Sequence, residues 1–543
     1  MTVSPLRAIV IGLTVAAWFS GHGFSQQTEL TWPREVRSSA GTIVVYSPQF
    51  DSFSGDSLNA RAAISVTPAG TGKTTFGAVW IQAHAAVDRE TRIVTLTDGR
   101  IPTVKLPGAS QAQIDTVARA LERQLNSRAL SLPLDKVIAA LESASMPIQS
   151  GEGFENDPPK IIVVNFPAVL IPVDGMPKMR KVDGYNIEEA VNTPFFVVRD
   201  LSTGAYYIKG GPLWYKGTVE GDKPTFELVD SAPSDVVAYY RSIASEEDLA
   251  ADTSKAERDQ APRLLFTQEP AELISYDGKP DLKPIKGTEL LFLSNSEQDV
   301  FMDIPSQRYF VLFSGRWFTA AALEGPWAFV PADNLPRDFQ KIPPDGPKGH
   351  VLASVAGTQA AREAVLETQI PQTASVSVDS TKAKVTYDGA PKFEPIPGTE
   401  MTYAVNSQTA VIYCSGQYYA CDNGVWFVSP AAEGPWGVCS SVPPAIYTIP
   451  PSCPVYPVTY VKVYSATPTV VVVGYTPGYC GSYVYGPTVI YGTGYSYPAW
   501  YGAYYYPRPV TYGFNFHYNP WTGWSMGFTV GSAGPGGWFS ISV

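Results

Sequence analysis

The sequence predicts a mostly β protein of the α+β class. We expect an N-terminal α+β domain, three tandem antiparallel β-meander repeats with helical connectors, and a Tyr/Gly/Pro-rich tail. Three observations lead to this expectation. Two segments 109 residues apart share most of their aromatic and turn residues, residues 28–150 mix strand-like and helix-like patterns, and no Asp or Glu follows Gly434.

A chain of 543 residues is too long for a single hydrophobic core, since domains usually hold about 100 to 200 residues. The repeats supply natural boundaries. We expect a signal peptide at 1–25, the α+β domain at 28–150, a degenerate β repeat 1 at 159–232, a helical connector at 233–261, β repeat 2 at 262–345, a second helical connector at 346–370, β repeat 3 at 371–447 and the low-charge tail at 454–543.

The first residues are typical of an export signal. Arg7 precedes an apolar run at 8–19, and the small residues Gly23 and Ser25 provide a cleavage position before Gln26. The run is too short to span a bilayer, and no later segment offers about 20 uninterrupted apolar residues. We therefore expect an exported bacterial protein, periplasmic or at the cell surface or extracellular, with no transmembrane span beyond the signal peptide. An uncleaved anchor is the alternative.

The α+β domain shows both periodicities. Runs rich in Val, Ile, Thr and aromatic residues predict strands at 42–46, 62–67, 75–82 and 92–96. Apolar residues spaced for one helical face then predict helices at 111–126 and 134–141.

The string Gly-Thr-Gly-Lys-Thr at 70–74 resembles the end of a phosphate-binding loop. Such a loop needs a Gly five positions before the Gly-Lys pair and a helix after it. Here Thr67 occupies that position and a strand pattern follows. We interpret 70–74 as a polar hairpin turn, not as a nucleotide site.

Repeats 2 and 3 carry the same motifs. Segments 309–330 and 418–439 share a Tyr, a Gly-X-Trp-Phe string and a Glu-Gly-Pro-Trp string, and upstream each repeat has Tyr-Asp-Gly followed by Gly-Thr-Glu. Asp-Gly pairs favour tight hairpin turns, and strand-like alternation follows them. Repeat 1 keeps an Asp-Gly pair and Trp214 but lacks Gly-Pro-Trp.

The aromatic residues of the repeats are candidates for carbohydrate binding, because a Trp or Tyr face can stack on the apolar face of a sugar ring. The alternative is that the rings form the cores of small β units. Neighbours such as Trp317 and Phe318 point to opposite faces of a strand, so one of each pair can be core and the other exposed, and we favour Trp317 and Trp426 as core residues. The candidate carbohydrate-binding residues are Trp317, Trp327, Trp426, Trp436, Trp214, Tyr309 and Tyr418.

All five cysteines lie late in the chain, at 414, 421, 439, 453 and 480. In an exported protein they indicate disulfide capacity, and a bridge between Cys421 and Cys439 would enclose the tryptophan strings of repeat 3. One of the five thiols is left over. Their spacing does not fit the ligand pairs of a zinc site, so we expect no metal.

The tail is poor in charge and rich in tyrosine. Sixteen of the 31 tyrosines follow Pro454, and only Lys462 and Arg508 are charged there. This composition excludes long helices and leaves short strands or disorder as alternatives. Its tyrosine-glycine character suits stacking or self-association.

The chain resembles exported bacterial proteins labelled carbohydrate-binding family V/XII. The resemblance rests on the tandem Tyr-Asp-Gly and Glu-Gly-Pro-Trp strings, the run at 464–470 and the string TYGFNFHYNPWTGW at 511–524, and it covers most of the mature chain. It implies small chitin- or cellulose-binding units with exposed aromatic residues. Repeat 1 departs from the pattern most, because it lacks Gly-Pro-Trp.

Residues for catalysis are scarce. Outside the signal peptide the histidines are His84, His350 and His517, in three different regions, so a Ser-His-Asp or Cys-His arrangement has little to draw on. Carboxylates such as Asp277 and Glu289 suit a glycosidase in principle, but each such Asp belongs to a repeated Asp-Gly turn. We expect no enzyme, no catalytic residue and no cofactor, and we rank a glycan-active enzyme third.

The net charge of −11 and the absence of a basic stripe disfavour a nucleic-acid partner. We therefore expect a non-catalytic exported envelope protein whose tandem β modules bind polysaccharide, or another cell-envelope component, through exposed aromatic residues. The alternative is a structural or adhesive cell-surface protein that uses its aromatic tail for protein binding or self-association. The sequence leaves the oligomeric state open.

Overall fold

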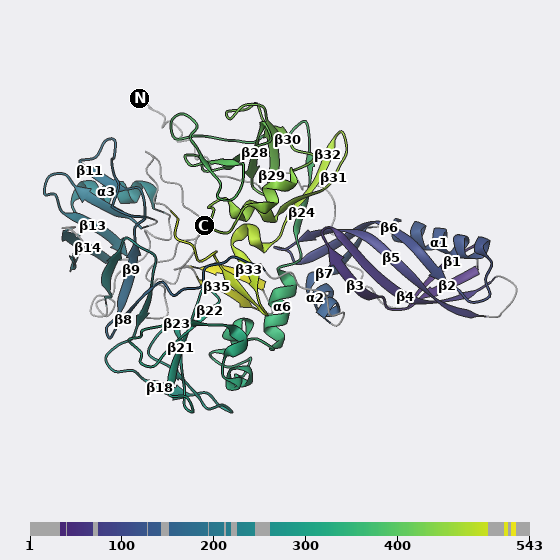
Figure 1. Ribbon diagram of the computed structural model, residues 1–543, viewed down its shortest axis with the longest axis horizontal. Helices are drawn as coiled ribbons and strands as arrows, with labels where there is room; N and C mark the ends of the chain where they lie inside the picture. Colours follow the sequence, from purple (N-terminus) through teal and green to yellow (C-terminus); the bar gives the residue numbers. More distant parts are fainter. Residues whose placement is uncertain are drawn as a thin grey trace, which may run out of the picture.

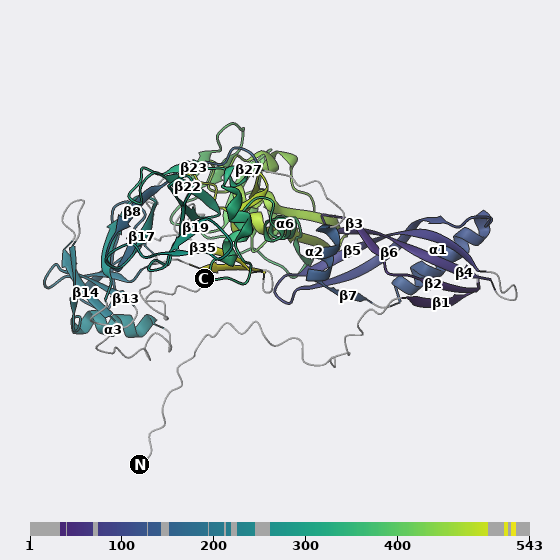
Figure 2. The same cartoon turned by 90° about the horizontal axis from the view of Figure 1, so that it is seen from below.

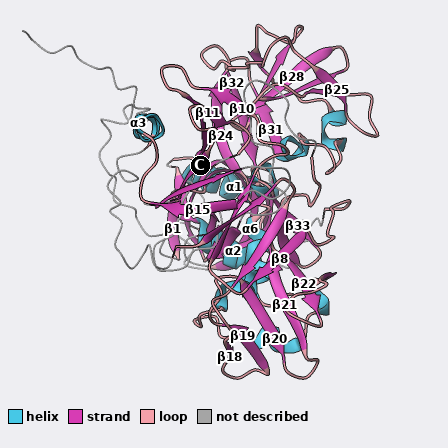
Figure 3. Ribbon diagram, turned by 90° about the vertical axis from the view of Figure 1, so that its left-hand side faces the viewer, coloured by secondary structure: helices cyan, strands magenta, loops and turns pink. Residues whose placement is uncertain are grey.

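The structure, a computed structural model, describes residues 33–39, 41–68, 74–127, 129–142, 151–193, 195–210, 213–218, 225–244 and 261–497, and the backbone of two strands at 515–519 and 523–527. The predicted signal peptide, residues 70–73 of the predicted turn and most of the tail beyond 497 lie outside these residues. Strands predominate (Figure 3), so the predicted mostly β class is confirmed.

The N-terminal domain is a seven-stranded antiparallel sheet. Its order is β1-β2-β4-β5-β6-β7, and β3 pairs with β4. Val, Ile and Ala alternate with polar residues along the long central strands, so one face is available for burial. The bounds are β1 Arg34–Ser38, β2 Gly41–Val45, β3 Gln49–Ser54, β4 Ser57–Thr67, β5 Thr75–Asp88, β6 Ile93–Lys105 and β7 Leu130–Pro133.

Two helices, α1 (Gln111–Leu125) and α2 (Leu134–Glu142), cover this sheet where the sequence predicts helices. The first turn of α1 is stabilised because the Gln113 side chain accepts a hydrogen bond from the Ser110 backbone N–H at 2.8 Å. Val117 lies among the buried residues of the sheet, at 1% exposure. Helix α2 packs on the other end of the sheet.

Each repeat contains a six-stranded antiparallel sheet whose strands follow chain order, so the three predicted meanders are present. We call these sheets and their leading strands units 1, 2 and 3. The pairing is equivalent in units 2 and 3, because Trp317 lies opposite Leu312 and Trp426 lies opposite Cys421.

The strands of unit 1 are β10 Met179–Lys181, β11 Ile187–Ala190, β12 Val197–Asp200, β13 Tyr206–Gly210, β14 Leu213–Thr218 and β15 Thr225–Val229. Unit 2 has β18 Leu282–Pro284, β19 Leu290–Leu293, β20 Asp299–Asp303, β21 Arg308–Phe313, β22 Arg316–Ala320 and β23 Ala328–Val330. Unit 3 has β25 Phe393–Pro395, β26 Thr402–Ala404, β27 Ala410–Cys414, β28 Gln417–Asp422, β29 Val425–Ser429 and β30 Gly437–Val438.

Units 1 and 2 exchange their leading strands. Unit 1 begins with β8 (Lys160–Val164) and β9 (Ala168–Pro172), and unit 2 begins with β16 (Arg263–Thr267) and β17 (Ala271–Ser275). Strand β8 pairs in parallel with β17, beside which it lies in Figure 2, and β9 pairs in parallel with β16. Lys160 lies opposite Ala271, and Ala168 lies opposite Arg263. Lys160 and Arg263 are equivalent positions, 103 residues apart, and so are Ala168 and Ala271, so the two pairings join the same positions with the units interchanged. The two units are therefore related by a local pseudo-two-fold axis.

Unit 3 takes its additional strands from the tail instead. Its leading strand β24 (Gln372–Ser377) pairs with β32 (Val470–Tyr475), which also pairs with β31 (Val461–Ala466). Val471 and Val473 of β32 are buried in the core of unit 3. Of the two alternatives for the tail, short strands are thus present in its described part, which includes β31 to β36.

The next described segment of the tail contacts unit 2 and also joins the core of unit 3, through Tyr483 and Ile490. Strands β33 (Ser482–Tyr485) and β34 (Thr488–Tyr491) form a hairpin, and the Tyr491 N–H donates to the Ser314 carbonyl at 3.0 Å. Gly315 has φ +73°, and a Cβ there would lie 2.4 Å from the Val489 carbonyl oxygen, so the contact requires glycine.

Helices join the units. The connectors contain α3 (Ser234–Ile243) and α6 (Gln359–Glu367). Short 3-10 helices and one further hairpin complete the structure: η1 Ala332–Asn334, η2 Arg337–Lys341, η3 Gly349–Ser354, η4 Pro444–Thr448, η5 Tyr456–Tyr460, η6 Pro477–Cys480, β35 Asn515–Asn519 and β36 Gly523–Gly527. Among the helices described, none combines the length and apolar character that crossing a membrane requires.

The molecule is elongated. The N-terminal domain projects from one end and the three units lie at the other, with β33 between units 2 and 3 (Figure 1). Helices α2 and α6 lie together at the junction, where Leu366 and Ile370 join the core beneath α2.

Candidate binding sites

The tryptophans of the Gly-X-Trp-Phe strings are core residues. Trp317 is 1% exposed and Trp426 is fully buried. Their indole N–H groups donate to the carbonyls of Ser354 at 2.7 Å and Val461 at 3.0 Å, which satisfies the polar atom of each ring. Their faces are therefore closed to a ligand, so both rings are core residues, as favoured from the sequence, and they are excluded as candidates for stacking on sugar.

Both faces of these sheets are covered, which explains this exclusion. Phe318, the neighbour of Trp317, is also fully buried, because β8 covers one face of unit 2 while η2 and η3 cover the other. Unit 3 repeats the arrangement, with Phe427 facing β32. The division of each pair into one core and one exposed ring does not occur.

The Glu-Gly-Pro-Trp strings form a repeated turn. In both units the Gly–Pro peptide bond is cis, and Gly325 and Gly434 have φ near +94° and +98°. The following indole folds back over the turn, so that a Cβ on Gly325 would lie 3.0 Å from Cδ1 of Trp327. These positions require glycine for both conformation and space.

Trp327 and Trp436, the tryptophans of these turns, share an unusual property. Each is 9% exposed, and the indole Nε1–H of each is buried without a hydrogen-bond partner in the structure. Buried N–H groups are nearly always paired, so an unpaired one needs an explanation. Within the described part of the chain, only two other buried side-chain atoms share this condition, on Glu367 and Ser407.

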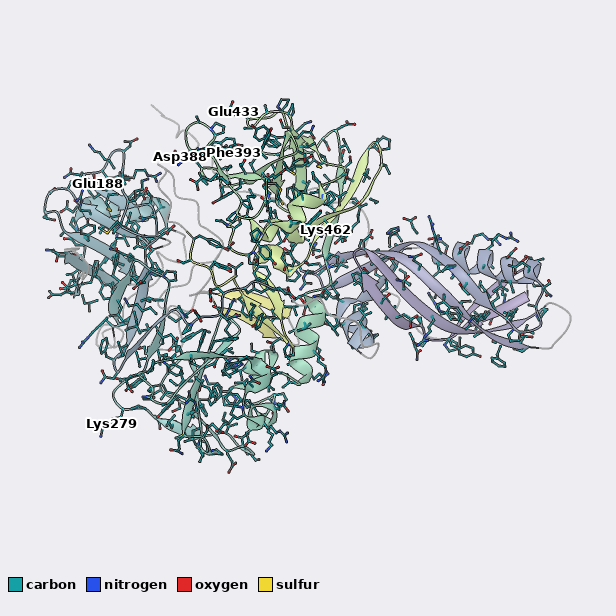
Figure 4. All side chains as sticks on the ribbon, viewed as in Figure 1. Glu188, Lys279, Asp388, Phe393, Glu433 and Lys462 are labelled. Carbon is teal, nitrogen blue, oxygen red and sulfur yellow. The ribbon has the colours of Figure 1, made fainter. Side chains whose placement is uncertain are left out.

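Polar and aromatic groups surround each turn in the same pattern. Glu324 and Glu433 are exposed; Figure 4 shows Glu433 at the outer edge of unit 3. Tyr387 donates its hydroxyl to the Ala432 carbonyl at 2.7 Å, and burial, with Tyr418 and Glu433 nearby, raises the pKa of Tyr387 to about 12.

The equivalent Tyr276 of unit 2 behaves likewise, because burial and then the charge of Glu324 raise its pKa. Each turn thus has a carboxylate, a tyrosine that is buried in unit 2 and half-buried in unit 3, and an unpaired indole N–H.

The predicted tyrosines Tyr309 and Tyr418 are half-buried at the edges of these clusters. The ring of Tyr418 lies 5.4 Å from that of Phe393 and 4.9 Å from that of Tyr413. Trp214 of unit 1 is also half-buried, 5.6 Å from the ring of Tyr240. Unit 1 lacks the Gly-Pro-Trp string, and its residues 219–224, between β14 and β15, lie outside the described part of the chain.

The predicted bridge between Cys421 and Cys439 is not formed. Cys421 in β28 lies opposite Trp426 in β29, and Cys439, just beyond β30, donates its N–H to the Trp426 carbonyl on the other side at 2.8 Å. Two strand spacings come to about 9.6 Å, whereas bridged Cα atoms lie within about 7 Å. Both thiols are buried and free, and burial raises the pKa of Cys421 to about 12.

The N-terminal domain contains a polar hollow that the sequence analysis does not predict. It has a volume of about 370 Å³ and is lined by His84, Asp98, Gly99, Arg100, Glu122 and Asn126. The one sequence signal was an Asp-Gly pair just after a strand pattern, which suggests the end of a strand. In the structure β6 continues through it with two register shifts against β5.

No cluster of three or more His, Cys, Asp or Glu side chains suited to a metal ion occurs among the residues that the structure describes. Comparison with protein-family models, with curated proteins and with solved structures gave no match to this chain.

Proposed function

We propose that this protein is a non-catalytic, exported envelope protein that binds polysaccharide at the equivalent cis turns of units 2 and 3. The observation that supports it most is the unpaired indole N–H that recurs on Trp327 and Trp436. Because this N–H is buried, a sugar hydroxyl oxygen would accept its hydrogen bond once ligand binding opens the turn, and the exposed carboxylate of Glu324 or Glu433 would accept one in return.

The tryptophans of the turns would recognise a sugar through the edge of the indole ring and not through its face. The ring faces are packed, so the donor edge of the indole makes the specific contact instead of stacking. Recognition of hydroxyl groups by buried polar groups discriminates well, because a ligand without the hydroxyl leaves the donor unpaired.

Two equal sites on one chain favour a polymeric ligand. A polysaccharide repeats the same acceptors along its length, so it can occupy both turns, and the second contact is then intramolecular. The alternative, adhesion through the tail, loses support between 461 and 491, since those residues pack into units 2 and 3 and are not available for self-association.

The test is a double Trp→Phe substitution at 327 and 436. Phe keeps most of the packing but removes the N–H, so we expect each site to lose about 1 kcal/mol, roughly fivefold in affinity, and the double variant to lose more because the sites act together. Binding is measured by pull-down on insoluble chitin, cellulose and peptidoglycan with the full mature chain.

The matched control is Trp80→Phe in the N-terminal domain, which makes the same chemical change away from the turns. A double variant that keeps the wild-type near-UV circular dichroism and still binds these polymers as the wild type does would refute the proposal. So would wild-type protein that binds none of them.

A further inference from the structure

The hollow in the N-terminal domain lies where the sheet is most irregular. Pairing between β5 and β6 places Trp80 opposite Thr103, Gln82 opposite Arg100 and His84 opposite Thr97, so β6 has an extra residue at each step. Asp98, inside this region, has φ +49°. β-Bulges change the direction in which side chains point, and they are common next to functional sites.

The end of helix α1 holds this irregular segment in place. The Asn126 side-chain amide donates to the Gly99 carbonyl at 2.8 Å and accepts from the Gly99 N–H at 2.8 Å. The Glu122 carboxylate accepts the Ile101 N–H at 2.9 Å. Gly99 is also closely packed, since a Cβ there would lie 2.9 Å from Leu125. These hydrogen bonds hold the backbone at Gly99 and Ile101 in one position beside the hollow.

Charges of both signs face the hollow without neutralising each other. Asp98 and Arg100 both line it, and neither forms an ion pair within the described part of the chain. His84 is held by Asp56, whose carboxylate lies 2.8 Å from its Nδ1, and this leaves Nε2 for another partner. One oxygen of Glu122 binds backbone, which leaves the other.

The geometry points to a binding site for a small zwitterion of the α-amino acid class. Its carboxylate would lie on the guanidinium of Arg100 and, with His84 in the protonated form that Asp56 favours, on the Nε2–H of that ring, and its ammonium group on the carboxylates of Asp98 and Glu122. A volume of about 370 Å³ is near the lower end for ligand sites, which suits a single amino acid or the end of a short peptide. This site is independent of the turns of units 2 and 3.

Three probes of nearly the same shape separate the possible ligand chemistries. L-alanine carries both charges, propionate only the carboxylate and ethylamine only the ammonium group. Each is titrated into the full mature chain by isothermal calorimetry. We expect L-alanine to bind in the millimolar range or tighter, and each single-charge analogue at least tenfold more weakly.

Two substitutions assign the binding to the hollow. Arg100→Gln and Asp98→Asn should each weaken L-alanine binding at least tenfold, and Asn tolerates the positive φ of Asp98. Arg123→Gln is the matched control, because Arg123 lies on the same helix, exposed and outside the hollow. Unchanged melting temperatures show that the variants fold.

Three outcomes would overturn the inference. They are no detectable binding of L-alanine, propionate binding as tightly as L-alanine, or Arg100→Gln and Asp98→Asn variants that bind like the wild type.

Discussion

Arg316 shows how a single buried charge can hold the tail in place. Its side chain is 1% exposed, and its guanidinium donates to Asn156 Oδ1 at 3.0 Å and to the carbonyls of Tyr491 at 2.7 Å and Gly492 at 2.9 Å. Repeat 3 has Val425 at the equivalent position. Arg316 thus connects unit 2 to the β33–β34 hairpin and to the segment before unit 1.

Replacing Arg316 with Met should detach these segments. The change removes the guanidinium that donates to the carbonyls of Tyr491 and Gly492, so we expect a loss of about 3 kcal/mol in stability and earlier proteolysis around the hairpin. Urea unfolding and limited proteolysis measure both effects. Arg308→Met, which removes an exposed arginine of the same unit, is the control. Equal midpoints for the two variants would contradict this role.

Asp299 makes a pH-dependent contribution. Burial alone would raise its pKa, but hydrogen bonds and charges from His350 and Lys348 outweigh this and lower the pKa to about 2. Because the folded pKa lies below the unfolded value of about 3.9, the stabilisation is present above pH 4 and is lost as pH falls from about 4 to 2.

The wild type should therefore lose about 2 kcal/mol more than Asp299→Asn between pH 5 and pH 2.5. Thermal unfolding at several pH values measures the difference. Asp277→Asn, in an exposed turn, should follow the wild type. Parallel pH profiles for the wild type and Asp299→Asn would show that Asp299 is not responsible.

Among the elements, the exchanged strands couple units 1 and 2 most directly. Ile161 and Val163 of β8 pack against the core of unit 2, and Leu264 and Phe266 of β16 pack against the core of unit 1. Strand β8, which precedes the sheet of unit 1, thus completes the core of unit 2, and strand β16, which precedes the sheet of unit 2, completes the core of unit 1.

This exchange predicts crossed effects. Ile161→Ala should speed amide hydrogen exchange in β17 to β22 of unit 2, and Leu264→Ala should do so in β11 to β14 of unit 1, each by an amount that corresponds to about 2 kcal/mol. Mass spectrometry resolves the two regions. Each variant serves as the control for the other. Faster exchange confined to the unit that follows the mutated strand would exclude strand exchange.

The sequence predicts the meanders but not how they are joined. The 109-residue offset and the shared strings predict equivalent sheets, because equal patterns of alternation and turns fold alike. The runs at β8, β9, β16 and β17 are all short and apolar, and periodicity does not state which run pairs with which. The prediction of the candidate site had the same limit. Alternation shows which residues share a face of a strand, but it does not show that both faces are covered, as they are at Trp317 and Phe318.

At the scale of the whole molecule, charged side chains fix the N-terminal domain to the units. Glu367 of α6 is 1% exposed and accepts from Arg89 at 3.1 Å and from Arg92 at 2.9 Å. Arg89 also donates to the carbonyls of Glu367 and Ile370. This network and the apolar contact of α2 with Leu366 join two bodies that lie at opposite ends of the molecule (Figure 1).

Glu367→Gln should loosen this junction. The substitution keeps the shape of the side chain but removes the counter-charge of the largely buried Arg89, whereas Arg92 keeps its ion pair with Asp135. Breaking a buried pair in this way costs about 3 to 5 kcal/mol. The domain cores do not contain Glu367, so the loss should appear as separation of the N-terminal domain and not as global unfolding. Small-angle X-ray scattering should show a larger radius of gyration while circular dichroism stays unchanged. Glu363→Gln on the exposed side of α6 should leave both measurements at wild-type values, and scattering curves for Glu367→Gln that superimpose on the wild type would show that apolar contacts alone hold the junction.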